Sequence, residues 1–384
     1  MPSIMLPDAG RALVSYTTAP PRLFERAAPP FPRVAYAAAH VVADPLADAD
    51  PWHASAIDWD RTIAFRRHLW SLGLGVAEAM DTAQRGMGLD WPASLELIRR
   101  TLDAARDAPG ALVASGAGTD HLAPGASLDD VLRGYEAQCA AIEALGGRII
   151  LMASRALVAA ARGPDDYHRI YGRVLGGLRA PAIIHWLGDM FDPALAGYWG
   201  SRDLDAATET CLAMLRDNAG NIDGIKVSLL DRDREIALRR RLPRGVRMYT
   251  GDDFNYPELI AGDAAGYSDA LLGIFDPIAP AASAALGALQ RGDAAGFHAI
   301  LAPTLPLSRH VFRAPTRFYK TGVVFLAWLA GHQEHFVMVG GQQSARSLLH
   351  LSELFRLADR AGLLPDPETA CSRMEMLLAL HGVG

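Results

Sequence analysis

Lysine is almost absent from this chain, although arginine is not. Of the 37 lysines and arginines in 384 residues, only Lys226 and Lys320 are lysines. Arginine therefore carries the positive charge of the surface, and each lysine needs a local reason for its position. Lys226 lies within the apolar run DGIKVSL, residues 223–229, where a solvent-exposed charge is not expected. It is the first candidate for chemistry in this sequence.

Cysteine is also scarce. The three cysteines, Cys139, Cys211 and Cys371, are an odd number and form no CxxC pair. This pattern argues against a disulfide framework and against a cysteine zinc site. It fits a protein of a reducing compartment.

Long apolar runs and basic clusters are missing as well. No 18 apolar residues follow one another, and the N-terminal region lacks a basic segment followed by an apolar one. The formal net charge is −6, and no block of lysine and arginine occurs. We therefore expect a cytoplasmic protein that acts on a small molecule, with no nucleic-acid partner, no membrane partner and no cofactor.

The sequence does contain a regular alternation of short apolar runs with segments of helical period. Several of the helical segments begin on an aspartate or serine that can cap a helix. Strands buried on both faces and joined by helices form a parallel sheet, and eight such units match a closed barrel. An open doubly wound sheet is the alternative, but no GxGxxG turn follows the first run. The eight predicted strands lie at 33–42, 73–80, 110–115, 148–154, 181–187, 223–229, 245–250 and 267–275.

The ends of the chain differ from this central part. Residues 1–32 are proline-rich and aperiodic, which predicts an extension lying beside the fold. Residues 33–292 form the predicted α/β (β/α)8 TIM barrel. Residues 293–384 contain only helical patterns and predict a C-terminal helical appendage, with Lys320 near the start of a helix.

Lys226 occupies an inward position of the sixth predicted strand. Alternation directs Ile225 and Val227 toward the helices, and Gly224, Lys226 and Ser228 into the barrel. Loss of hydration lowers the pKa of a lysine and frees the amine to attack a carbonyl and form a Schiff base. A buried lysine that only pairs with a carboxylate is the alternative.

Four motifs then carry a resemblance to a known family. GIKVSLLD at 224–231 resembles the GIKDSSGD-type sixth-strand motif of the dihydrodipicolinate synthase and N-acetylneuraminate lyase family, class I aldolases whose lysine forms the substrate imine. RMYTGDD at 247–253 is similar to the family's sGdD segment, SGAGTDH at 115–121 to its third-strand end, and PAIIHWLGD at 181–189 to its PiilYNvPgr. The likeness runs from about residue 58 to 307 and continues into the helical tail. It implies a divergent branch, catalogued as a domain of unknown function, that forms a homo-oligomer, either a dimer or a tetramer.

The departures from the family fall at positions that contact substrate. The family's GTTGE loop binds a 2-keto acid carboxylate, and here the residues are MDTAQ, 80–84. Thr82 is retained, but Asp81 replaces the other threonine. Because like charges repel in a low-dielectric pocket, the resemblance predicts that pyruvate is a doubtful substrate.

His185 stands where the family has its proton-shuttling tyrosine, and Met190 stands where part of the family has an arginine. Imidazole titrates near neutrality and can act as general acid and base, so we expect His185 to be catalytic beside Lys226. A hydrogen-bonded core histidine is the alternative.

Further residues at predicted strand ends are candidates for substrate binding. Arg155 can hold an anion or pair with an acid on the rim, and Asp252 and Asp253 can bind hydroxyl groups or cap the next helix. The predicted substrate-binding set is Asp81, Thr82, Ser154, Arg155, Ser228, Gly251, Asp252 and Asp253.

Three functions remain open. The leading hypothesis is a lyase or aldolase in which Lys226 condenses with a small keto compound, without a metal. Because several acids lie at strand ends, namely Glu78, Asp81, Asp120, Asp189 and Asp252, we expect a carbohydrate-derived substrate. The second is a metal-dependent isomerase or hydro-lyase, with ligands from Glu78, Asp81, His121, His185 and Asp189. The third is a barrel that binds a sugar-like ligand without turnover.

Overall fold

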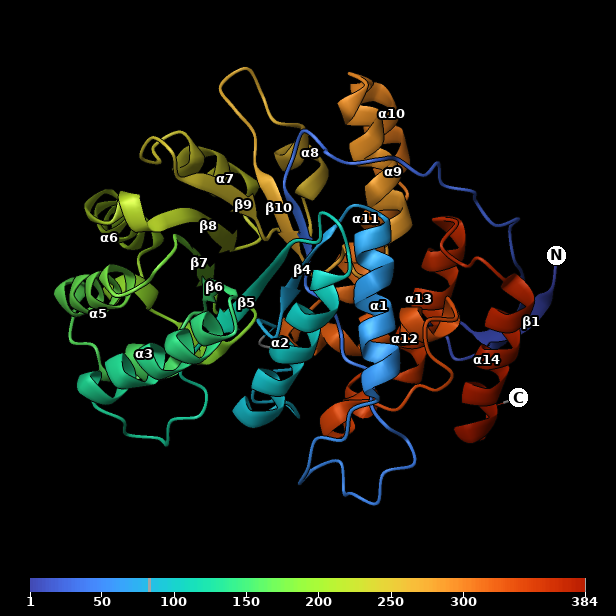
Figure 1. The fold of residues 1–384 in the computed structure, drawn as a ribbon. Helices are drawn as coiled ribbons and strands as arrows, with labels where there is room; N and C mark the ends of the chain where they lie inside the picture. The colour runs from blue at the N-terminus through green and yellow to red at the C-terminus, as the bar shows by residue number, and fades with distance from the viewer. Residues whose placement is uncertain (82–83, 384) are drawn as a thin grey trace.

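A computed structural model describes residues 1–81 and 84–383 of the protein. Eight parallel strands close into a barrel in the order β10-β3-β4-β5-β6-β7-β8-β9 (Figure 1). Each strand overlaps one of the eight predicted apolar runs, so the predicted (β/α)8 barrel is confirmed. The strands are β3 Ala35–Ala37, β4 Gly75–Glu78, β5 Val113–Ala117, β6 Arg148–Leu151, β7 Ala182–Leu187, β8 Ile222–Ser228, β9 Arg247–Thr250 and β10 Asp269–Leu272.

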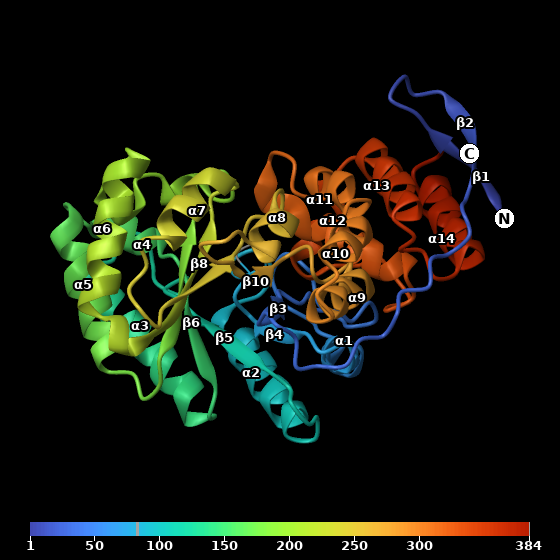
Figure 2. The same cartoon turned by 90° about the horizontal axis from the view of Figure 1, so that it is seen from above.

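Helices follow the strands and cover the outside of the barrel (Figures 1 and 2). Asp58 and Ser127, at the starts of two predicted helical segments, cap α1 and α3, and Asp90 and Asp203 cap α2 and α6 in the same way. The helices are α1 Trp59–Ser71, α2 Trp91–Arg106, α3 Leu128–Ala144, α4 Arg155–Ala160, α5 Pro164–Gly176, α6 Leu204–Asp217, α7 Arg232–Arg239, α8 Tyr256–Ala261 and α9 Ala279–Gln290. Short 3-10 turns lie at Pro193–Leu195, Tyr198–Gly200, Ala219–Asn221, Thr316–Phe318 and Val339–Ala345.

The chain ends in a group of helices beside the barrel, as the sequence predicted (Figure 2). These are α10 Ala294–Leu301, α11 Thr304–Val311, α12 Tyr319–Leu329, α13 Leu348–Arg360 and α14 Pro367–Leu380. Every residue of α12 is buried. A helix that is apolar on all sides has no solvent face, so α12 forms the centre of this group.

The N-terminal residues form a hairpin that the sequence did not predict. β1 Ser3–Pro7 pairs antiparallel with β2 Leu13–Thr17 and contacts α13 and α14 (Figure 2). The Tyr16 hydroxyl donates to Asp359 at 2.7 Å. Five-residue strands carry little periodic signal, and this hairpin owes its place to the C-terminal helices.

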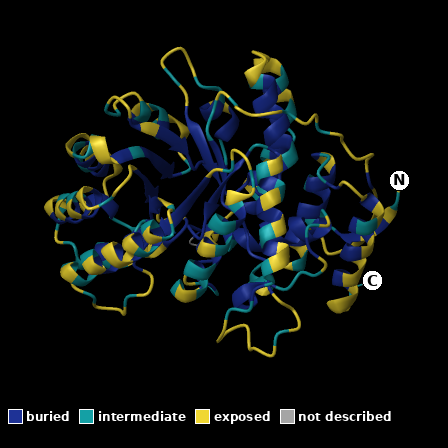
Figure 3. Ribbon diagram, in the orientation of Figure 1, coloured by how far each residue is buried: buried dark blue, intermediate teal, exposed yellow. Residues whose placement is uncertain are grey.

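Burial separates two cores. Figure 3 shows the barrel strands buried in the middle of the molecule. One core lies between strands and helices, while a smaller one fills the barrel interior with Tyr36, Met80, Ile150, Met152 and Tyr249 among its members. Among the described helices, none combines the length and the apolar character required to cross a bilayer.

Candidate active site

Lys226 points into the barrel from β8, as alternation predicted. Its neighbours Ile225 and Val227 belong to the outer core between strands and helices. Lys226 is 7% exposed, and its register partner on β7 is His185. The lysine therefore lies on the sixth barrel strand with its amine in the interior.

A small cavity surrounds the amine. The volume available to the centre of a water molecule is about 10 Å³, roughly what one water needs. A keto compound can enter only if side chains at the mouth move. The lining residues are Met80, Asp81, His185, Leu187, Phe191, Lys226, Ser228, Asp253, Gly273 and Tyr319.

Burial lowers the pKa of Lys226 to about 8, the largest cause being loss of hydration. The charges of Asp253 and Asp81 raise this pKa, and the charge of Lys320 lowers it. Among the described residues, the one polar contact of Nζ is the sulfur of Met80, at 3.9 Å. A thioether does not hold a proton on the amine, so the amine is not fixed in an ion pair.

Asp253 is the acid that faces Lys226, whereas Asp252 points elsewhere. Asp253 accepts the Ile274 amide at 2.8 Å and lines the cavity. Burial raises its pKa to about 7. Asp252 caps its own loop by accepting the amides of Phe254 and Asn255 at 2.8 and 3.0 Å. Asp252 thus holds its own loop and is not the N-cap of α8, which is Asn255. Its binding of substrate stays a prediction.

Asp81 is neutralised by the second lysine of the chain. Lys320 Nζ lies 2.6 Å from Asp81 Oδ2 and donates to the Ala38 carbonyl at 2.7 Å. The Tyr319 hydroxyl donates to Asp81 Oδ1. The positive charge of Lys320 offsets the negative charge of Asp81. The repulsion between Asp81 and a substrate carboxylate is therefore weaker than expected from Asp81 alone, and pyruvate is no longer disfavoured on this ground.

His185 lies beside Lys226 in the cavity. Its Nε2 is 3.3 Å from Ser228 Oγ, and its Nδ1 has no hydrogen-bond partner among the described residues. Burial, and then the charge of Lys226, lower the pKa of His185 well below its usual value. The ring is therefore neutral at physiological pH and serves as a hydrogen-bond acceptor or donor rather than as a cation.

Gly251 gives Lys226 the space that it occupies. A Cβ on Gly251 would lie 2.7 Å from Lys226 Cε, 2.2 Å from Ser228 Oγ and 2.8 Å from the Val227 carbonyl. Any side chain here would displace the lysine. The structure thus brings Gly251 and Ser228 to the site, in positions that shape it.

Two other predicted binding residues lie away from the amine. Ser154 is buried, bonds Thr119 at 2.6 Å and caps α4, and its contact with substrate stays a prediction. Arg155 pairs with Asp192 on the rim, which was the alternative. Thr82 lies outside the described residues.

The acids predicted to bind a metal do not come together. Glu78 is bound by Arg66 at 2.8 and 2.9 Å and by Thr101 at 2.6 Å, on the helix side of β4. His121 bonds Gln138 at 2.7 Å, and Asp189 is exposed. Within residues 1–81 and 84–383, no group of three or more histidines, cysteines, aspartates or glutamates has the arrangement of a metal site.

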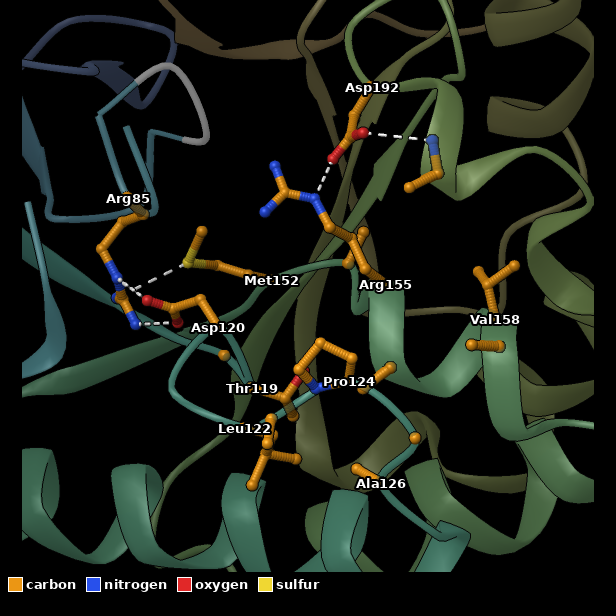
Figure 4. Close-up of a pocket in the computed structure, with 17 residues that line it drawn as sticks. Arg85, Thr119, Asp120, Leu122, Pro124, Ala126, Met152, Arg155, Val158 and Asp192 are labelled. Carbon is orange, nitrogen blue, oxygen red and sulfur yellow. Dashed lines mark hydrogen bonds and ion pairs between the residues drawn. The ribbon is translucent and has the colours of Figure 1, made fainter. Parts of the chain in front are cut away.

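A second, larger cavity lies at the ends of β5, β6 and β7 (Figure 4). The volume available to the centre of a water molecule in this cavity is about 420 Å³. That volume is in the range of small-ligand sites. Figure 4 shows its two charge pairs, Arg85 with Asp120 and Arg155 with Asp192. Among the described residues, its lining contains no lysine, cysteine or serine, whereas the smaller cavity contains Lys226. The two cavities flank Gly116, where a Cβ would meet both Met80 and Met152.

Sequence reasoning missed Tyr319, Lys320 and Phe191. The signal for Lys320 was present, because YKTGVVFLAWL places a lysine at the start of an otherwise apolar helix. The criterion that singled out Lys226, a rare lysine in an apolar segment, applies equally to Lys320. Phe191 lacks such a signal.

A barrel with a buried lysine on its sixth strand, followed by C-terminal helices, has the fold of the dihydrodipicolinate synthases. The Aquifex aeolicus enzyme superposes with a TM-score of 0.61 at 12% identity, over 91% of this chain and 98% of that one. The Acinetobacter baumannii enzyme, complexed with pyruvate, superposes with a TM-score of 0.62 at 15% identity, over 86% of this chain and 99% of that one. A prophage protein of the same family from E. coli K12, also in complex with pyruvate, superposes with a TM-score of 0.64 at 12% identity, over 91% of this chain and 98% of that one.

The chain belongs to the family described as protein of unknown function DUF993, whose model matches residues 4–383. A search of curated proteins gives no match. The expectation of a divergent branch catalogued as a domain of unknown function is confirmed.

Proposed function

We propose that the protein is a class I lyase of the aldolase type in which Lys226 forms a Schiff base with a small keto compound. The observation that carries the proposal is a buried amine whose pKa is lowered to about 8 and whose polar contact is a thioether. At neutral pH roughly a tenth of such amines are unprotonated, against less than a thousandth of exposed lysines. That fraction is the nucleophile.

The reaction begins with attack of Nζ on the carbonyl carbon. The carbinolamine loses its hydroxyl as water, and Asp253, with its pKa raised to about 7 by burial, supplies the proton for this departure. His185 and Ser228 orient the substrate through the hydrogen bonds that the neutral ring and the hydroxyl can make. The iminium ion then accepts the electron pair released when a neighbouring C–C or C–H bond breaks.

The substrate is a small keto compound. Two of the similar structures contain pyruvate, and Lys320 offsets the charge of Asp81, so a 2-keto acid is admissible. The carbohydrate-derived substrate stays a prediction, because four of the five acids that suggested it already bind other protein groups and the fifth, Asp189, is exposed. Glu78 is bound to Arg66, Asp120 to Arg85, and Asp252 to its own loop.

The larger cavity suits the second reactant or the remote part of a longer substrate. Its walls are mainly apolar, from Leu122, Pro124, Met152 and Val158. Both of its arginines already hold a carboxylate. An uncharged group fits this surface better than a further anion does. A homo-oligomeric state and a cytoplasmic location also stay predictions.

Reductive trapping tests the proposal. The protein is incubated with pyruvate or dihydroxyacetone and sodium cyanoborohydride, and tryptic peptides are mapped by mass spectrometry. With two lysines in the chain, the adduct should appear on Lys226, and Lys320 serves as an internal control for non-specific modification. The Lys226→Met variant should remain unmodified. A native protein without an adduct on Lys226 from either probe would refute the Schiff-base mechanism.

Two alternatives give different results. A metal-dependent isomerase would lose activity with a chelator and would tolerate Lys226→Arg. A barrel without catalysis would bind a sugar-like ligand and give neither adduct nor turnover. The separation of Glu78, His121 and Asp189 disfavours the metal-dependent isomerase. The lowered pKa of Lys226 disfavours the barrel without catalysis.

A further inference from the structure

The first residue of α12 lines the cavity that surrounds the Lys226 amine. Tyr319 and Lys320 are the first residues of α12, more than ninety positions beyond Lys226 in the chain, yet Tyr319 lines the same cavity. Tyr319 stacks on Phe312 with ring centroids 4.4 Å apart and meets Phe191 edge-on at 6.2 Å. Packing on both sides therefore holds the phenol in one position.

The hydroxyl of Tyr319 is bonded to a base. It donates to Asp81 Oδ1, and Lys320 holds the other carboxylate oxygen at 2.6 Å. Both lysine and carboxylate are nearly fully buried, at 1% and 4% exposure. A buried carboxylate is costly without an opposite charge, and Lys320 supplies that charge. The result is a chain of three groups, Lys320, Asp81 and Tyr319, which ends in the cavity that contains the Lys226 amine.

We propose that Tyr319 and Asp81 form a proton relay for the Schiff base on Lys226, and that Lys320 is the positioning residue that keeps Asp81 ionised. The inference rests on the proposed function and deepens it. It assigns the proton transfer at carbon to Tyr319 of the C-terminal helices, acting with Asp81 from the loop after β4.

The relay step balances in atoms and charge. The iminium ion on Lys226 loses a proton from the adjacent carbon to Tyr319 Oη, while the phenol passes its own proton to Asp81 Oδ1. The C–H electron pair becomes the C=C bond of an enamine, and the C=N pair returns to nitrogen. Asp81 is neutral afterwards, as is the enamine, so one positive and one negative charge disappear together. In a buried site this pairing avoids an isolated charge.

The chemistry of the phenol agrees with a relay rather than with a tyrosinate base. Burial, and then the charge of Asp81, raise the pKa of Tyr319 well above its usual value. The phenol therefore stays protonated and can accept a proton only as it gives one up. A carboxylate in direct hydrogen-bond contact makes that exchange possible.

The test separates imine formation from proton transfer at carbon. Native protein and Tyr319→Phe are incubated with pyruvate in D₂O, and loss of the methyl signal is followed by NMR, while cyanoborohydride trapping is measured in parallel. We expect Tyr319→Phe to retain the adduct on Lys226 and to lose exchange by about 10²–10⁴-fold. Tyr171→Phe is the matched control. It removes another buried hydroxyl, which bonds Tyr198 at 2.7 Å on the outside of the barrel, and should exchange as the native protein does.

Lys320→Met tests the positioning role of Lys320. The measured quantity is the pH dependence of trapping, which a loss of packing alone would not change. Lys320 lowers the pKa of Lys226, so without it the pH at which trapping is half-maximal should shift upward, and exchange should fall. Circular dichroism and thermal melting check that each variant folds, and Lys320→Arg, which keeps the charge, should restore part of the exchange.

Each possible result supports or overturns a stated part of the proposal. Full exchange by Tyr319→Phe with an intact adduct would overturn the relay and leave the proposed function standing. An unshifted trapping profile in folded Lys320→Met would overturn the role of Lys320. Absence of any adduct in the native protein would remove the proposed function, and the relay with it. A native protein that forms the adduct but exchanges no deuterium would also overturn the relay.

Discussion

His185 and Lys226 are register partners on neighbouring parallel strands, and the charge of the lysine lowers the pKa of the histidine. The two side chains point to the same side of the sheet because cross-strand partners share a face. A protonated amine beside an imidazole disfavours a second proton. The pair thus carries at most one positive charge in the cavity, and that charge belongs to Lys226.

Imine formation should depend on pH through Lys226. Since its pKa in the folded protein is about 8, the neutral amine increases tenfold per pH unit below that value and levels off above it. Because Asp253, the proposed proton donor, loses its proton above its pKa of about 7, trapping with pyruvate should rise from pH 6 to a maximum between about pH 7 and 8 and then fall. Initial rates of adduct formation across that range provide the measurement. A plateau already reached at pH 6, or a rise that continues to pH 10, would contradict the burial of the amine.

Lys226→Met should abolish trapping and stabilise the protein. Burial lowers the pKa of this lysine from 10.5 to about 8. Below pH 8 the folded protein therefore holds a charged ammonium group in a buried position, which costs free energy, whereas in the unfolded chain the same group is hydrated. Between pH 8 and 10.5 the unfolded chain binds more protons, and native stability rises with pH. We expect Lys226→Met to be more stable by on the order of 1–3 kcal/mol at pH 7.

Urea unfolding at pH 7 and at pH 10 measures this stability difference. The advantage of Lys226→Met over the native protein should shrink at the higher pH, where the native lysine no longer carries the penalty. A variant that is less stable than the native protein at pH 7 would show that the lysine is held by a favourable interaction. The matched control is Arg106→Met, on an exposed side chain, which should change stability little at either pH.

Gly251→Ala should disrupt the site. The added methyl would lie 2.2 Å from Ser228 Oγ and 2.7 Å from Lys226 Cε, distances that force both side chains to move. Overpacking of this kind costs typically about 1–3 kcal/mol. We expect a lower melting temperature and a loss of trapping of at least tenfold. Gly220→Ala is the control, because nothing lies within 4 Å of the added methyl. Unchanged trapping by Gly251→Ala would show that the amine tolerates displacement.

Glu78→Gln should destabilise the barrel without acting on the chemistry. Glu78 and Arg66 are both fully buried and joined by two hydrogen bonds. Breaking such a pair leaves an uncompensated buried charge and costs about 3–5 kcal/mol. Thermal unfolding is the measurement, with Glu96→Gln on the surface of α2 as control. If the folded fraction of Glu78→Gln loses trapping altogether, Glu78 also acts in the reaction.

The strand pattern was readable because it is local. Eight apolar runs separated by capped helical segments specify a parallel barrel, and alternation along DGIKVSL places Lys226 inside it. The same local logic failed for Asp252 and Asp253. Two adjacent acids after β9 differ in role because one side chain turns back to its own loop and the other accepts an amide from the loop after β10.

The barrel, the helical appendage and the inward lysine could be predicted from the residue pattern, since each depends on periodicity within a few residues. Which charges meet became clear from the folded chain alone. Asp81 and Lys320 are separated by most of the chain, and their ion pair exists because the packing of α12 brings its first turn to the barrel mouth. Electrostatic interactions act through space rather than along the chain, and their partners become apparent only when the chain has folded.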